Sequence, residues 1–133
     1  MLKIKKLFAK ILNAIIEIRS TLTVQTINSN VTTTTGRYVS STCRRYGNVV
    51  YLQLIFYNTA SVGAGSNLYQ ATFTNVVPRP IVNCTGAGFY GSHSTPGSLT
   101  TGRVVTVRNA SSTALTIGSS NTCAVTFTYI TND

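Results

Sequence analysis

Acidic residues are almost absent from this sequence of 133 residues. Asp and Glu together number 2, Glu17 and Asp133, against 11 Lys and Arg, so the formal net charge is +9. No carboxylate pair is available for glycoside hydrolysis, and a serine–histidine pair would lack its orienting acid. Carboxylate ligands for Mg²⁺ or Ca²⁺ are lacking as well. We therefore expect a protein with no enzymatic activity, no catalytic residues and no cofactor.

Cysteine and histidine are scarce too. The 3 cysteines, Cys43, Cys84 and Cys123, have no CxxC spacing, and their odd number leaves at least one thiol outside any disulfide. Each lies in an apolar or Thr-rich run, where free cysteine behaves as a small hydrophobic residue. The single histidine, His93, completes no zinc-ligand spacing with them. We expect buried, reduced cysteines and no metal site.

Charged residues as a whole make up only 10 % of the sequence, whereas hydrophobic residues make up 43 %. Disordered chains and nucleic-acid-binding tails carry more charge and fewer apolar residues. A chain of this length fits a single domain. The composition therefore predicts one folded body with a hydrophobic core.

Residues 1–19 contain no Gly, Pro or Thr and have helical periodicity. Isoleucine at both core positions of a heptad favours bundles of three or four helices. A helix this short is marginal in water unless another surface covers its apolar side. We expect an oligomerisation or docking helix whose apolar stripe, with spacings of three and four, consists of Ile4, Phe8, Ile11, Ile15 and Ile18.

Other interpretations of residues 1–19 remain open. A secretory signal peptide needs an uninterrupted apolar stretch, which Asn13 and Glu17 break. The same residues, together with Lys10, argue against a membrane span. A cationic helix on a membrane surface and a helix packed on its own domain are further alternatives. Nucleic-acid binding is disfavoured because Phe8, on the apolar stripe, is the segment's single aromatic residue.

From Ser20 onward, Thr, Ser, Asn and Gly dominate, and the apolar residues are mostly β-branched or aromatic, as in strands. The pattern predicts an all-β fold, an antiparallel β-sandwich or jelly roll with a short N-terminal helix. We divide the chain into a helix (1–19), a strand with a Thr-rich linker (20–35) and a β-sandwich head domain (36–133). Strands are expected at 21–27, 37–45, 49–57, 68–73, 81–84, 86–90, 103–108, 113–117 and 123–129.

The segments between these strands carry further expectations. Residues 28–35 are expected to be a polar linker, and 59–67 and 91–98 to be exposed loops. The run 49–57 has apolar residues at both odd and even positions, which predicts a central strand buried on both faces. The turn 109–112 is expected to join the strand 103–108 to its return arm, the strand 113–117, which should pair beside it.

Three segments of the β region carry a resemblance to a known family. They are GRYVSSTCRRYGNVVYLQLIFYN (36–58), FTNVVPR (73–79) and GRVVTVRNASSTALTIGSSNTCAVTFTYIT (102–131). Together they resemble the small β-sandwich head domains of phage fibre and tail proteins. The resemblance covers roughly residues 36 to 131 and rests on several weak motifs, since similar Thr/Gly/Asn-rich strands occur in adhesins and lectins.

The resemblance implies a homotrimer on the virion surface, joined through its N-terminal helix to a capsid or tail protein. It implies attachment to the host surface, through an envelope glycan or an anionic polymer. A full tail fibre has a long shaft, so a short fibre or a small tail-tip protein fits this chain better. The alternative is a capsid decoration protein, or a small jelly-roll capsid protein with a basic N-terminal arm.

Candidate ligand-binding residues come from the expected loops and strand ends. Tyr90 and His93 flank Gly91 in an expected exposed loop, where an aromatic ring can stack on a sugar. Arg103 begins an expected strand in a body with no carboxylate before Asp133, so its charge has few partners within the chain. We therefore take Tyr90, His93 and Arg103 as ligand-binding candidates.

Overall fold

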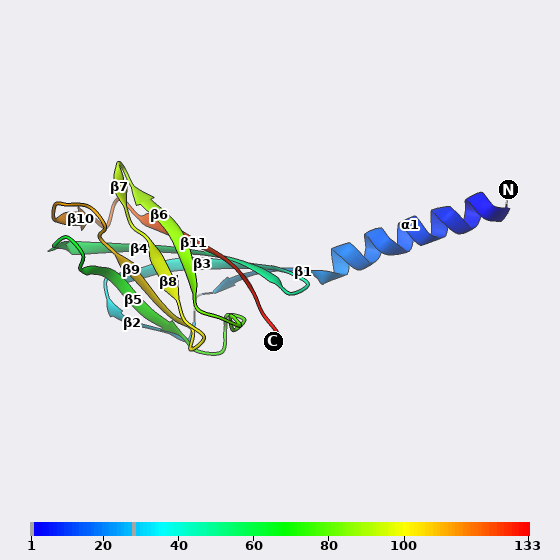
Figure 1. The fold of residues 1–133 in the computed structure, drawn as a ribbon, viewed down its shortest axis with the longest axis horizontal. Helices are drawn as coiled ribbons and strands as arrows, with labels where there is room; N and C mark the ends of the chain where they lie inside the picture. Colours follow the sequence, from blue (N-terminus) through cyan, green and yellow to red (C-terminus); the bar gives the residue numbers. More distant parts are fainter. Residues whose placement is uncertain (1, 28) are drawn as a thin grey trace.

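The computed structural model describes the backbone of residues 2–27 and 29–133, and the side chains of these ranges apart from 16–23. A helix, α1 (Leu2–Thr21), comes first, and Figure 1 shows it beyond one end of the strands. The strands are β1 (Leu22–Ile27), β2 (Val31–Thr35), β3 (Arg37–Tyr46), β4 (Val49–Val62), β5 (Asn67–Phe73), β6 (Cys84–Tyr90), β7 (His93–Ser94), β8 (Gly97–Leu99), β9 (Val104–Arg108), β10 (Leu115–Ile117) and β11 (Cys123–Ile130).

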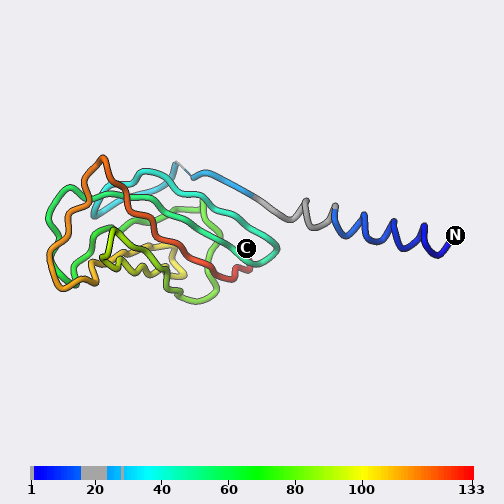
Figure 2. Tube along the Cα trace, turned by 90° about the horizontal axis from the view of Figure 1, so that it is seen from above, coloured from blue at the N-terminus to red at the C-terminus, as the bar shows by residue number. Residues whose placement is uncertain are grey.

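These strands form one antiparallel sheet, so the predicted all-β class of the body is confirmed. Nine strands follow the order β1-β3-β4-β11-β6-β8-β9-β5-β2, while β10 pairs with β4 and β7 pairs with β6. Strand β6 is shared between two halves of the sheet. Its residues 87–89 pair with β11, and its residues 84–86 pair with β8. The sheet curls there, so the inner faces of the two halves meet (Figures 1 and 2).

The hydrophobic core fills the space inside this curl. Alternate residues of β4 and β11 point inward from one half, and residues of β5, β8 and β9 pack against them from the other. Burial of each large apolar side chain stabilises the fold by about 1.5–3 kcal/mol. Those with no exposed surface include Val50, Leu52, Leu54, Phe56, Leu68, Tyr69, Phe73, Leu99, Val105, Val107, Ile117 and Val125.

Several predicted elements are confirmed. The strands expected at 37–45 and 49–57 are β3 and β4, which form a hairpin that turns at Gly47 with a φ of 55°. The strand expected at 123–129 is β11, and the one expected at 68–73 is β5. The expected helix is also present and ends at Thr21.

Strand β4 is less buried than the sequence predicted. It is central in the sheet, but only one of its faces is buried, and Val49 and Tyr51 are exposed on the other. The expectation of burial on both faces was wrong because the described residues form no second layer over the outer face. The strand also runs on to Val62, so the loop expected from residue 59 is reduced to residues 63–66.

The Thr-rich segment 28–35 is not the linker that was expected. Residues 31–35 form β2, which pairs with β5 from Val31 opposite Phe73 to Thr35 opposite Gln70. Four consecutive β-branched threonines suit an edge strand with one face toward the core. The boundary placed between 35 and 36 therefore falls in the connection between two paired strands.

Three further predictions were wrong. Residues 81–83 are irregular chain rather than the start of a strand, since the contact with β11 is limited to the bridge of Pro80 to Thr131 and the bond from the Ile81 amide to the Ile130 carbonyl oxygen. The expected exposed loop 91–98 contains β7 and the start of β8, and Thr95 within it is fully buried. The return arm expected beside β9 is β10, which pairs with β4 instead.

The curl at β6 depends on glycines that lie under an aromatic ring. Gly86 and Gly97 are Cα partners across β6 and β8, and the Phe127 ring packs over both. A methyl group at either position would lie 2.7 Å from that ring, closer than van der Waals contact allows. The two glycines therefore let β11 approach the point where the halves of the sheet meet.

We predict that Gly97→Ala lowers the free energy of unfolding by about 1–3 kcal/mol, because the added methyl meets Phe127 and Val125. Chemical denaturation measures this cost. Combining Gly97→Ala with Phe127→Leu should cost less than the two single changes together, since the shorter side chain relieves the clash.

The matched control is Gly118→Ala. A methyl group at Gly118 has no neighbour within 4 Å, so its effect should stay within about 0.5 kcal/mol. Strictly additive costs for Gly97→Ala and Phe127→Leu would contradict the packing described.

Candidate functional site

Helix α1 presents an uncovered apolar stripe. Every described side chain from Leu2 to Ile15 is exposed, so none of them packs on the β-strands. Ile18, the last residue of the predicted stripe, lies outside the residues whose side chains are described. Among the described residues, no helix is apolar over a length that could cross a membrane. The large apolar side chains, each 44–70 % exposed, are Leu2, Ile4, Leu7, Phe8, Ile11, Leu12 and Ile15.

The β body also has an exposed apolar face. On the outer side of the sheet, Tyr46, Val49 and Ile130 lie in one row across β3, β4 and β11. Val24 and Tyr51 lie in the next row, on either side of Arg44. All five apolar residues are at least 38 % exposed, at the end of the strands where α1 joins β1. Contiguous patches of this kind mark interaction surfaces more often than isolated apolar residues do.

The structure brings Tyr90 and His93 together. They are Cα partners across the tight turn that joins β6 to β7, where Gly91 has a φ of 59°. Both side chains are half-buried, whereas the neighbouring Phe89 is 66 % exposed on the outer side of the sheet. The sequence analysis did not select Phe89. The available signal was its position next to the buried Gly88, because neighbouring residues of a strand with one buried face point to opposite sides.

Arg103 lies apart from that pair. Arg103 follows β8, and the last residue of β8, Leu99, is opposite Cys84, the first residue of β6. Arg103 therefore lies near the start of β6, whereas Tyr90 is at its end. Its Nε donates to the Val77 carbonyl oxygen at 2.6 Å, and its Nη2 lies 3.0 Å from the Asp133 carboxylate. Its side chain is only 18 % exposed and its backbone φ is 62°. The guanidinium is therefore held within the fold.

Asp133 joins this arginine to two others. Its carboxylate accepts a hydrogen bond from the Arg79 backbone amide, and its carbonyl oxygen accepts one from the Arg45 guanidinium. The Arg79 amide and the charge of Arg103 hold the pKa of Asp133 below its ordinary value. The sequence places no carboxylate in the body before Asp133, and Asp133 is the residue with which Arg103 pairs.

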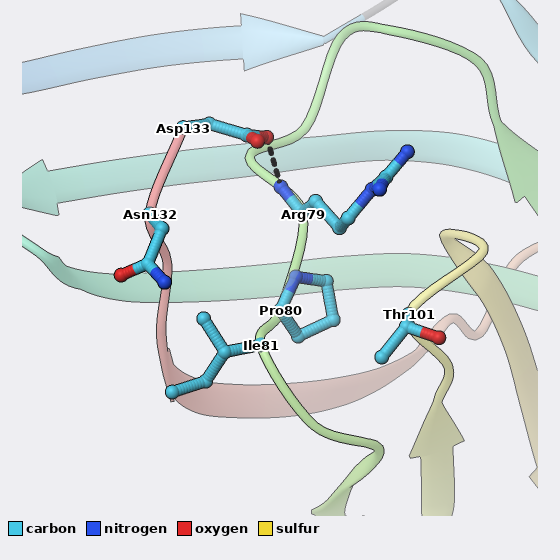
Figure 3. Close-up of a pocket in the computed structure, with 6 residues that line it drawn as sticks. All are labelled: Arg79, Pro80, Ile81, Thr101, Asn132 and Asp133. Atoms are coloured by element: carbon cyan, nitrogen blue, oxygen red, sulfur yellow. Dashed lines mark hydrogen bonds between the residues drawn. The ribbon is translucent and has the colours of Figure 1, made fainter.

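An open hollow of about 370 Å³ lies beside this cluster. Figure 3 shows Asp133 bonded to the Arg79 amide, while the Arg79 side chain extends away from Asn132 and Ile81. The hollow lies near the helix-proximal end of the body, where Pro80 bridges to Thr131 just after β11. Its lining residues are Arg79, Pro80, Ile81, Thr101, Asn132 and Asp133.

The cysteines are separate thiols in the structure. Cys43 and Cys123 are buried, as expected, whereas Cys84 is half-buried. Burial raises the pKa of all three thiols, which keeps them protonated and poor nucleophiles. Within the described ranges, no three His, Cys, Asp or Glu side chains gather as a metal site would require.

No protein-family model matches this sequence, and the search of curated proteins gives no significant match. The family resemblance of residues 36–131 therefore stays a hypothesis from motifs. The function has to be argued from the exposed surfaces, the charges and the clefts of the chain itself.

We predict that Asp133→Asn removes a pH-dependent part of the stability. Because the pKa of Asp133 is lowered from 3.8 in the fold, its stabilising effect is complete above that value and is lost as the pH falls through the folded pKa. The unfolding midpoint of the wild type should therefore drop more steeply between about pH 5 and pH 2 than that of the variant.

Asn132→Ala is the control, because it changes the same hollow without removing a charge. It should keep the wild-type slope at acid pH. Equal slopes for the wild type and Asp133→Asn would show that the carboxylate contributes nothing to the fold.

Proposed function

We propose that this chain is a non-enzymatic virion protein, the head domain of a short fibre or tail tip that attaches to the host surface as a homotrimer. The observation that carries the proposal is the uncovered apolar stripe of α1. A helix of this length does not persist alone in water, so its exposed face needs a partner. Identical copies are the simplest partner, because isoleucine at both core positions favours three or four helices.

The β body supports the same proposal because its core is complete without the helix. The buried residues come from both halves of the curled sheet, and none comes from the described part of α1. We class the curled sheet as a β-sandwich related to the jelly roll, since two inner faces enclose one core. An independent body on a separate oligomerisation helix is the organisation that a trimeric head requires.

The exposed apolar face around Tyr46 and Val49 lies next to the start of β1. It would extend contacts between copies from the helix onto the body. The opposite end of the strands would then face outward, and rigid loops at such an end are where binding sites usually lie. There the buried Asn109 donates to the carbonyl oxygens of Val62 and Thr113, which fixes two loops to each other.

A second candidate follows from the basic residues of the helix. Lys3, Lys5, Lys6 and Lys10 are all exposed, as they would be in the arm of a small capsid protein that contacts nucleic acid. Replacing the four lysines by glutamine separates the two functions. Loss of nucleic-acid binding with the oligomer intact would favour the capsid protein.

We predict that light scattering gives three chain masses for the full chain and one for a chain that begins at Ser20. Within the full chain, Ile11→Lys should dissociate the trimer, because it places a charge in the apolar stripe. Asn13→Lys adds the same charge outside the stripe and is the matched control.

A trimer that survives truncation would move the main interface to the β body. Monomers in both samples would refute the fibre proposal. Dissociation by Asn13→Lys and Ile11→Lys alike would point to charge repulsion in place of a specific apolar interface.

A further inference from the structure

A polar cleft opens at the end of the strands away from α1. Strand β3 runs from Arg37 to Tyr46, and Tyr46 is opposite Leu22, the first residue after the helix. At about 3.3 Å per residue, Arg37 is therefore roughly 30 Å from that junction. Figures 1 and 2 show the β2–β3 connection at this far end. The cleft has a volume of about 360 Å³ and is lined by Thr33, Thr34, Gly36, Arg37, Asn58, Thr59 and Ala60.

The walls of the cleft are fixed by close packing. Gly36 has a φ of 75°, and a side chain there would lie 2.6 Å from the Leu68 carbonyl oxygen, so the chain can turn from β2 to β3 only with glycine. Asn58 is 8 % exposed and donates to the same carbonyl oxygen at 2.9 Å, while its own oxygen accepts from the Ala60 amide. Both sides of the cleft are thus tied to the start of β5.

The threonines supply oriented hydroxyl groups. Thr34 donates to the Gln70 carbonyl oxygen at 3.2 Å, and the Thr33 hydroxyl lies 3.5 Å from that of Tyr69. Burial raises the pKa of Tyr69 to about 12, so both hydroxyl groups of this pair carry a proton and either can donate to the other. The Thr33 side chain also lines the cleft, where its hydroxyl group can donate a hydrogen bond to a ligand or accept one. Thr59 is exposed on the opposite wall.

Arg37 is the charged group of the cleft. Within the described part of the chain, the one ion pair joins Arg103 to Asp133, and the Arg37 guanidinium forms none. The body from residue 20 carries six arginines and a single carboxylate side chain, that of Asp133, so no acid of the body lies near this end to neutralise Arg37. An anionic group of a ligand is the natural partner of an uncompensated guanidinium.

We propose that this cleft binds an acidic saccharide, with the sugar carboxylate on Arg37 and the sugar hydroxyl groups on Thr33 and Thr59. The volume suits a sugar unit, and hydroxyl donors beside one guanidinium match a polyhydroxylated anion. The inference rests on the proposed attachment function and names the ligand class. Three such sites on a trimer would bind a repeating polymer far more strongly than one site would.

The test is titration of the full chain with an oligogalacturonate and with a neutral galactan of the same length, at fixed ionic strength. The wild type should prefer the acidic oligosaccharide. Arg37→Gln should weaken its binding about fivefold, the scale of one exposed charged contact. Arg108→Gln is the matched control, since it removes the same charge from an exposed position of β9 that does not line the cleft.

Thr59→Val is a second variant that keeps side-chain volume and removes a hydroxyl group, and it should weaken binding without changing the charge. Equal weakening by Arg37→Gln and Arg108→Gln would overturn the site in favour of general charge attraction, as would the absence of any preference for the acidic sugar. Light scattering on the same samples separates the two proposals. A trimer without acidic-sugar binding refutes the cleft, whereas a monomer that binds through Arg37 refutes the trimeric head.

Discussion

The packing of the Phe127 ring over Gly86 and Gly97 is the contact on which the rest of the body depends. Strand β6 belongs to both halves of the sheet, and a side chain at Gly86, Gly88 or Gly97 would collide with its neighbours. Because no side chain intervenes there, the sheet can curl tightly enough for β5 and β9 to reach the inner face of β4. The hydrophobic core is the result of that curl, and so are the two ends of the body.

Those two ends differ in chemistry. Toward α1, the body presents an apolar outer face and an aspartate that three arginine residues surround. Away from α1, it presents hydroxyl groups, loops fixed by Asn109, and the uncompensated Arg37. The long strands β3 and β4 run from one end to the other and hold the two surfaces apart. This polarity is the reason for assigning assembly to one end and recognition to the other.

Local signals in the sequence predicted the local elements. The N-terminal helix, the strands expected at 37–45 and 49–57 and the strand expected at 123–129 each depend on neighbours in the sequence, and each is present in the structure. Apolar content alone misled at Ile81 and Val82, which lie in irregular chain after the Pro80–Thr131 bridge and are 48 % and 64 % exposed. The Arg103–Asp133 pair and the cleft between 33–37 and 58–60 join distant segments. Their juxtaposition follows from the curl of the sheet, and no sequence spacing encodes it.

The charge of the body comes almost entirely from one side-chain type. All six basic residues after residue 20 are arginine, which stays protonated at any pH met in biology, and the single carboxylate is already bonded to the fold. The positive field of the body is therefore nearly constant from neutral to mildly alkaline surroundings. Ionic strength, which screens such a field over about 8–10 Å, is the condition that would strengthen or release its hold on an anionic surface.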